Sequence, residues 1–255
     1  MRDSVAPDPV AAESRPAERW IDILLVPLVA SGLPAVVLAI MALSGSRFRD
    51  RFGIDPFSNY TFYAAMAGFY LSVLAAVSFL LLLRGKKTGR VFFGKGRAIW
   101  SFVAVPAGIL LALGAAGFLS LLPDELQQEM MEKSAALEPG TIVEALCLLL
   151  VVAVLAPLAE EIYFRGIMLR VFERHFSFAL STVITAIIFT LVHGHLFPVP
   201  GPSGLILTGI LFFLGVLLAL LARAGGSLRA PFAMHAAYNA TLMLPGVYTL
   251  LVTQT

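Results

Sequence analysis

Seven stretches of mostly apolar residues alternate with short polar segments along this chain. Each stretch approaches the roughly 20 residues that an α-helix needs to cross the hydrocarbon core of a bilayer. The pattern predicts an all-α protein, a polytopic integral membrane bundle of seven or eight transmembrane helices, since Pro245-Gly246 interrupts the last stretch. The stretches are residues 20–43, 61–83, 98–122, 142–172, 178–197, 205–222 and 230–253.

The composition changes this picture only by excluding alternatives. Of 255 residues, 59% are hydrophobic and 13% charged, whereas a soluble domain is about 45–50% apolar and about 25% charged. A soluble or fully disordered chain is therefore excluded, and the lipid bilayer is the expected surrounding. The net charge of +2 gives no reason to expect a nucleic-acid partner. A single cysteine, Cys147, excludes an intrachain disulfide and a cysteine-based zinc site.

Charge in the connecting segments predicts the domain plan and the orientation. Residues 1–19 are rich in proline, alanine and charge, and we expect a disordered cytoplasmic tail, followed by one transmembrane domain over residues 20–255. The segment 84–97 carries six Lys or Arg and no acid, whereas 123–140 is strongly acidic. Basic loops stay in the cytoplasm, so this pattern predicts a multi-pass protein of the cell membrane with a cytoplasmic N-terminus. Three arginines within residues 47–51 fit this orientation poorly.

Acidic residues inside apolar stretches are candidates for function, because burying a charge in a membrane is costly. Asp22 and Glu144 lie near the ends of stretches and are expected at the interface. Glu160 and Glu161 lie deep in one stretch, and Arg165 follows Glu161 by four residues, so these two share a helical face and can pair. Glu160 faces elsewhere, as a general base would. A purely structural alternative is that both carboxylates pair with Arg165 or lie at the interface.

Two further stretches carry polar side chains at a matching depth. His193 lies late in its stretch, and His235 and Asn239 share one helical face at four-residue spacing. With a rise of 1.5 Å per residue, Glu160 and His193 lie about 18 and 21 Å from the cytoplasmic turn at residues 172–178. Counted from Arg229, His235 lies about 9 Å and Asn239 about 15 Å into its stretch. If the helices are neighbours, these four residues converge on one buried site.

The available side chains limit the chemistry. The chain has no Gly-x-Ser-x-Gly, no cysteine near a histidine and no His-Glu-x-x-His. A carboxylate, imidazoles and an amide can activate water and stabilise an oxyanion, which is acyl-bond hydrolysis. Glu160, His193 and His235 are also possible ligands of Zn²⁺, but they would be a sparse set. We therefore favour a mechanism that requires no cofactor and keep zinc as the alternative.

Three motifs in order resemble those of the CPBP intramembrane proteases, which include CAAX prenyl endopeptidases and bacteriocin-processing enzymes. They are Glu160-Glu161-x-x-x-Arg165, Phe189-x-x-x-His193 and His235-x-x-x-Asn239, and the resemblance covers about residues 141–245. It implies an intramembrane endopeptidase that cleaves a membrane-associated peptide or lipidated protein.

By the same resemblance, each motif residue has an implied role. Glu160 and His193 would activate the attacking water, and His235 and Asn239 would stabilise the oxyanion, with Glu161 and Arg165 as supporting groups. The family leaves metal dependence open, because both metalloprotease and metal-free glutamate mechanisms are argued for it.

Two other functions stay open from the sequence. Glu160, His193 and His235 could form the proton or ion relay of a transporter, although we find no internal repeat of the kind typical of transporters. The chain could also be a non-catalytic membrane scaffold that keeps the motifs for structure. His195, two residues beyond His193, is expected at the interface.

Overall fold

The computed structural model describes residues 18–44, 58–94, 96–135, 139–193 and 201–253. Every regular element within these ranges is a helix, and no strand occurs in them, which confirms the predicted all-α class. The three arginines of residues 47–51 and His195 lie outside the described residues.

The helices follow the predicted apolar stretches closely. The stretch 142–172 forms one continuous central helix of five consecutive segments, which are α8 (Ile142–Leu150), η1 (Val151–Leu155), α9 (Ala156–Glu160), η2 (Glu161–Met168) and α10 (Leu169–Phe172). The other helices are α2 (Trp20–Ser44), α4 (Asn59–Leu83), α5 (Thr88–Phe93), α6 (Ala98–Leu119), α7 (Asp124–Ala135), α11 (Phe178–Val192), α12 (Pro202–Gly225) and α13 (Arg229–Thr253).

Local signals define where several of these helices start and end. Ser58, Thr141 and Ser177 each accept a hydrogen bond from the backbone N–H three residues ahead, at the N-termini of α4, α8 and α11. Such side chains satisfy N–H groups that the first helical turn leaves unpaired. At the other end of α12, Gly226 adopts a left-handed conformation with φ of 65° that stops the helix.

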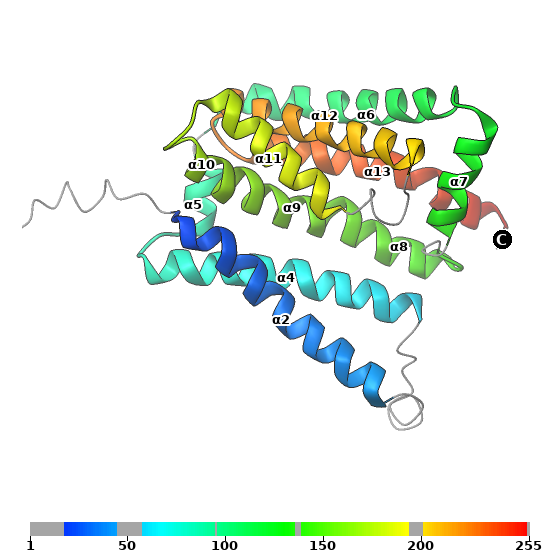
Figure 1. Cartoon of the computed structure of the whole chain (residues 1–255), viewed down its shortest axis with the longest axis horizontal. Coiled ribbons are helices and arrows are strands. Elements are labelled where there is room, and N and C mark those ends of the chain that lie inside the picture. The colour runs from blue at the N-terminus through cyan, green and yellow to red at the C-terminus, as the bar shows by residue number, and fades with distance from the viewer. Residues whose placement is uncertain (1–17, 45–57, 95, 136–138, 194–200, 254–255) are drawn as a thin grey trace, which may run out of the picture.

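The central helix lies between two groups of helices (Figure 1). On one side it contacts α2 and α4, which pack against each other, and on the other it contacts α13, which packs on α6 and α12. Helix α11 packs on α12 and touches the central helix near η2 and α10. The central helix is accordingly the most buried of the candidate spans, and it carries the acidic motif at the middle of the bundle.

The number of spans is confirmed only in part. Among the described residues, four helices are long and apolar enough to cross a membrane, namely α4, α6, the central helix and α12. The described apolar part of α2 and the 15-residue α11 are shorter, and α13 is long but carries polar residues such as His235 and Asn239. Helix α13 continues through Pro245 as one helix. The total of seven or eight spans therefore stays a prediction.

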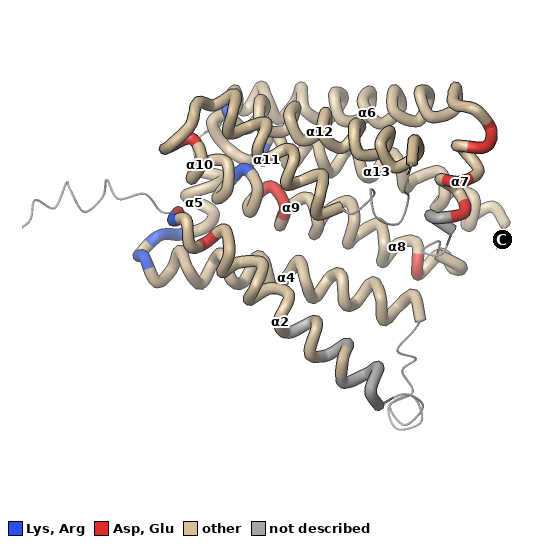
Figure 2. The backbone as a smooth tube through the Cα atoms, viewed as in Figure 1, with Lys and Arg blue, Asp and Glu red and all other residues tan. Residues whose placement is uncertain are grey.

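Charged residues separate toward the two ends of the bundle (Figure 2). Lys and Arg gather at the end that holds α5 and the start of α2, where acidic segments also lie, while acids alone mark the opposite end, on α7 and at the start of α8. Both α5, in the basic segment, and α7, in the acidic one, are short helices that the sequence pattern did not predict. The distribution matches the charge asymmetry on which the predicted orientation depends.

Two buried carboxylates attach the N-terminal end of α2 to the bundle. The predicted tail falls outside the described residues up to residue 17, but Glu18 is buried and accepts hydrogen bonds from Arg170 (3.1 Å) and Arg174 (2.7 Å). The packed chain therefore begins before residue 20. Asp22 is also buried, and both of its oxygens accept from the guanidinium of Arg84 at 2.6 Å. These hydrogen bonds raise the pKa of Arg84.

We predict that Asp22→Asn lowers the free energy of unfolding by about 1.5–3 kcal/mol, because it weakens a buried, charge-assisted pair. Glu173→Gln is the matched control, since Glu173 pairs with Arg223 at 3.5 Å in a much more exposed place, and should cost less than about 1 kcal/mol. Unfolding of the two variants in the same detergent measures the difference. Equal losses would contradict the view that the Asp22–Arg84 pair anchors α2.

Candidate active site

The central helix changes its hydrogen bonding on both sides of Glu160. In η1 the N–H of Ala156 donates to the carbonyl of Val151, and at the end of η2 the N–H of Leu169 donates to Phe164, five residues back in both cases. Such π-helical turns are rare in proteins, and those that occur are often found at functional sites. Pro157 gives a local reason for the first, because it has no N–H for the regular ladder.

Asn239 satisfies the carbonyl that this irregularity leaves open. Because the N–H of Ala156 goes to Val151, the next donor for the carbonyl of Val152 would be the N–H at position 157, which proline lacks. The side-chain amide of Asn239 donates to that carbonyl at 2.8 Å. Asn239 therefore joins α13 to the central helix about two turns before Glu160.

A buried network of charge joins four helices beside Glu160. Oε1 of Glu161 accepts from Nη1 of Arg165 at 3.0 Å and from Nδ1 of His235 at 2.9 Å. Nη2 of Arg165 donates to the carbonyl of Gly215 in α12 at 3.0 Å, and the guanidinium lies 4.6 Å from the centre of the Phe189 ring in α11. The predicted pairing of Glu161 with Arg165 is confirmed, and it leaves Glu160 to face another way.

Close backbone packing sets the position of His235. Helix α6 approaches α13 so closely at Gly108 that a methyl group there would overlap the carbonyl of Met234. Met234 directly precedes His235, so the small residue on α6 allows α13 to bring its imidazole to Glu161. His235 is 2% exposed, and the network therefore operates away from bulk water.

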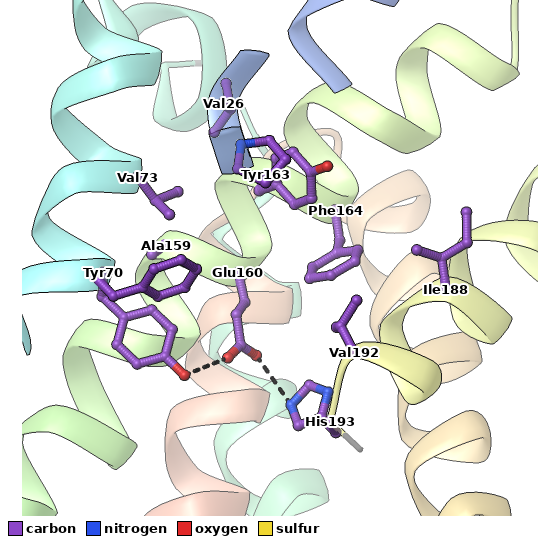
Figure 3. Close-up of a pocket in the computed structure, with 12 residues that line it drawn as sticks. Val26, Tyr70, Val73, Ala159, Glu160, Tyr163, Phe164, Ile188, Val192 and His193 are labelled. Carbon is purple, nitrogen blue, oxygen red and sulfur yellow. Dashed lines mark hydrogen bonds and ion pairs between the residues drawn. The ribbon is translucent and has the colours of Figure 1, made fainter. Parts of the chain in front are cut away.

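The carboxylate of Glu160 faces both histidines. Oε2 lies 3.7 Å from Nε2 of His193 and 3.8 Å from Nε2 of His235, and Oε1 accepts a hydrogen bond from the Tyr70 hydroxyl at 3.1 Å (Figure 3). The two histidine contacts are longer than a hydrogen bond. The three motif residues that the sequence analysis expected at one level thus converge from the central helix, α11 and α13.

The hydrogen bonds of the two imidazoles define their tautomers. Nδ1 of His193 lies 2.6 Å from the carbonyl oxygen of Phe189, and Nδ1 of His235 lies against Glu161. A carbonyl oxygen and an ionised carboxylate only accept, so we assign the proton to Nδ1 in both rings. In the neutral rings, both Nε2 atoms then direct a lone pair toward Glu160. This part of the site presents acceptors that suit a donor such as water.

A cavity of about 440 Å³ opens beside Glu160 (Figure 3). It lies between α2, α4, the central helix and α11, and most of its wall is apolar, with polar groups from Tyr70, Glu160 and His193. The apolar part of the wall is formed by Val26, Pro27, Phe69, Val73, Ala159, Phe164, Ile188 and Val192, with the largely apolar Tyr163. An apolar segment can therefore lie next to a carboxylate and an imidazole.

The structure brings three of the four predicted catalytic residues together. Glu160, His193 and His235 lie together, whereas the contact that the structure gives the Asn239 side chain is with the Val152 carbonyl. Tyr70 was not among the sequence candidates. The sequence gives only a weak signal for Tyr70, namely a hydroxyl-bearing side chain inside an apolar stretch.

A zinc site among these residues was the open alternative. Within the described part of the chain, no group of three or more His, Cys, Asp and Glu side chains is placed to hold a metal ion. The zinc alternative therefore stays a prediction, and we derive no step through a metal.

Comparison with known proteins finds one family match, over the segment that carries these residues. Residues 142–241 match the family described as type II CAAX prenyl endopeptidase, Rce1-like. The match confirms the predicted resemblance to CPBP proteases over the segment from the central helix to α13. No curated protein and no solved structure matches the chain.

A double-mutant cycle tests whether Asn239 compensates for the backbone N–H that Pro157 lacks. Asn239→Leu keeps the approximate volume but leaves the Val152 carbonyl unpaired, which should cost about 1–3 kcal/mol of unfolding free energy. Pro157→Ala supplies a backbone N–H that can donate to the Val152 carbonyl in place of Asn239. In the Pro157→Ala background, Asn239→Leu should therefore cost about 1 kcal/mol less of unfolding free energy. Additive effects of the two changes would show that Asn239 does not compensate for Pro157.

Proposed function

We propose that this protein is an intramembrane endopeptidase that hydrolyses a peptide bond with water activated by Glu160 and His193. The observation that carries the proposal is the convergence of the Glu160 carboxylate with the Nε2 atoms of His193 and His235 beside an apolar cavity. The Rce1-like match over the same helices supports this reaction class.

The attacking water binds between Oε2 of Glu160 and Nε2 of His193, which are 3.7 Å apart. Both atoms accept hydrogen bonds, so they hold and orient a molecule that has two protons to donate. Glu160 removes one proton as the water oxygen attacks the carbonyl carbon of the substrate. The same carboxylic acid then returns that proton to the leaving amine, which balances the reaction.

The tetrahedral intermediate needs donors for its negative oxygen. His235 is placed for this role when Nε2 also carries a proton, because Glu161 at Nδ1 compensates the positive charge of the ring. Asn239 uses one amide N–H on Val152, and its second N–H can serve the oxyanion. Glu161 and Arg165 act as positioning residues that fix the ring of His235.

The lining of the cavity supports an apolar, membrane-associated substrate. An apolar side chain or chain segment of a membrane-associated peptide or lipidated protein suits the mostly apolar wall beside Glu160. The basic end of the bundle around α5 and α10 lies in the cytoplasm, as the positive-inside rule favours, with the N-terminus on that side in a cell membrane.

Replacing the base should abolish cleavage without unfolding the protein. Glu160→Gln keeps the shape and the acceptor for Tyr70 but cannot take a proton, so kcat should fall about 10²–10⁴-fold. Cleavage of a peptide library in nanodiscs, followed by mass spectrometry, measures it, with Glu173→Gln as the matched control. Full activity of Glu160→Gln would refute the mechanism, whereas a scaffold or transport function would leave the wild type without cleavage.

A metal-free reaction predicts that a chelator leaves the cleavage rate unchanged. The same library assay with and without chelator tests this, and added Zn²⁺ should not raise the rate of the chelated protein. Loss of cleavage that Zn²⁺ restores would replace the present mechanism with a metalloprotease mechanism.

Filling the cavity should weaken substrate binding selectively. Ile188 lines the cavity from α11, and phenylalanine at this position should raise KM for peptides with bulky apolar residues about tenfold while kcat stays close to wild type. Ile187→Phe on the same helix is the matched control, because Ile187 is 45% exposed and lies outside the cavity wall. Equal kinetic effects of both variants would show that the cavity does not hold the substrate.

A further inference from the structure

Tyr70 is the one polar side chain from the N-terminal half of the described chain in the cavity wall. It lies on α4, 72 residues before the segment that matches the Rce1-like family begins. Its hydroxyl donates to Oε1 of Glu160 at 3.1 Å, across 90 residues of sequence. The site is therefore completed by a helix that carries none of the three motifs.

The hydrogen bond from Tyr70 gives the two oxygens of Glu160 different partners. Oε1 is occupied by Tyr70, while Oε2 faces His193 and His235 at 3.7 and 3.8 Å. A carboxylate on a flexible side chain can turn about its last torsion, because that torsion is broad, and at other angles neither oxygen would face the histidines squarely. A donor on one oxygen selects the orientation in which the other oxygen faces the histidines.

The ring of Tyr70 is itself held in place. It packs edge-on against Phe69 with the ring centres 5.4 Å apart, and it packs against the core cluster that contains Val26, Val73 and Ala159. Figure 3 shows the ring approaching Glu160 from the side of α4, opposite His193. The donor is therefore preorganised, which limits the entropy lost in holding the carboxylate.

We propose that Tyr70 is a positioning residue of the peptidase site, whose hydroxyl orients the Glu160 carboxylate so that Oε2 meets the water and the histidines. This inference rests on the proposed function. It makes α4 a part of the active site, and it predicts that loss of the hydroxyl lowers turnover rather than substrate binding.

The test compares Tyr70→Phe with Tyr63→Phe in nanodiscs. Phenylalanine keeps the ring and its packing in both cases, and Tyr63 is a buried tyrosine of the same helix that does not line the cavity. We expect kcat for cleavage of the peptide library to fall about tenfold in Tyr70→Phe with KM unchanged, and to stay at the wild-type value in Tyr63→Phe. If kcat is unchanged in Tyr70→Phe while Glu160→Gln loses activity strongly, the role of Tyr70 is refuted and the proposed function stands.

An infrared measurement tests the contact without relying on cleavage. The carboxylate band that disappears in Glu160→Gln is assigned to Glu160, and the loss of the Tyr70 hydroxyl should shift that band in Tyr70→Phe but not in Tyr63→Phe. A band at the wild-type position in folded Tyr70→Phe would refute the inference, whatever the protein cleaves. A shifted band in a protein whose Glu160→Gln variant is fully active would refute the proposed function instead.

Discussion

The buried network of Glu161, Arg165 and His235 is the constraint on which the site depends. Its charges contact the backbone of α12 and the ring of Phe189 in α11, so one arginine connects the central helix to two others. Removing one member would leave an uncompensated charge in the interior, which costs about 3–5 kcal/mol. Because Glu161 occupies Nδ1 of His235, the opposite nitrogen of that ring faces Glu160.

The second constraint is backbone chemistry in the central helix. Pro157 interrupts the hydrogen-bond ladder, a π-helical turn precedes it, and Asn239 supplies the missing donor from a neighbouring helix. Glu160 is thereby placed on a segment whose geometry differs from a regular helix on both sides. Consecutive residues of a helix point about 100° apart, so the two glutamates meet different partners. Glu161 meets buried cations, and Glu160 meets a tyrosine and the cavity.

Much of this arrangement was predictable from the sequence, and the parts that were not have physical reasons. The central helix was predicted with its observed ends, 142–172, because a long apolar stretch and helical spacing are local properties. The Glu161–Arg165 pair followed from four-residue spacing. The bond from Asn239 to Val152 was not predictable, because it depends on how the ladder rearranges around Pro157.

Tyr70 and the short helices escaped prediction for related reasons. A tyrosine in an apolar stretch has no periodic signal, and its partner Glu160 is distant in sequence, so only tertiary structure brings them together. Helix α5 has six residues and α7 has a polar sequence, and neither shows an apolar face long enough to be recognised. The span number was hard to settle because α13 carries the polar residues of the site.

The central claim is that Glu160 activates water for hydrolysis of a peptide bond inside this bundle. The most direct measurement is digestion of a membrane-embedded peptide library in water enriched in ¹⁸O, with wild type beside Glu160→Gln. Mass spectrometry should detect new C-termini that carry ¹⁸O with wild type, and these fragments should be missing with Glu160→Gln. No labelled fragments from folded wild type, or equal amounts from both proteins, would contradict the claim.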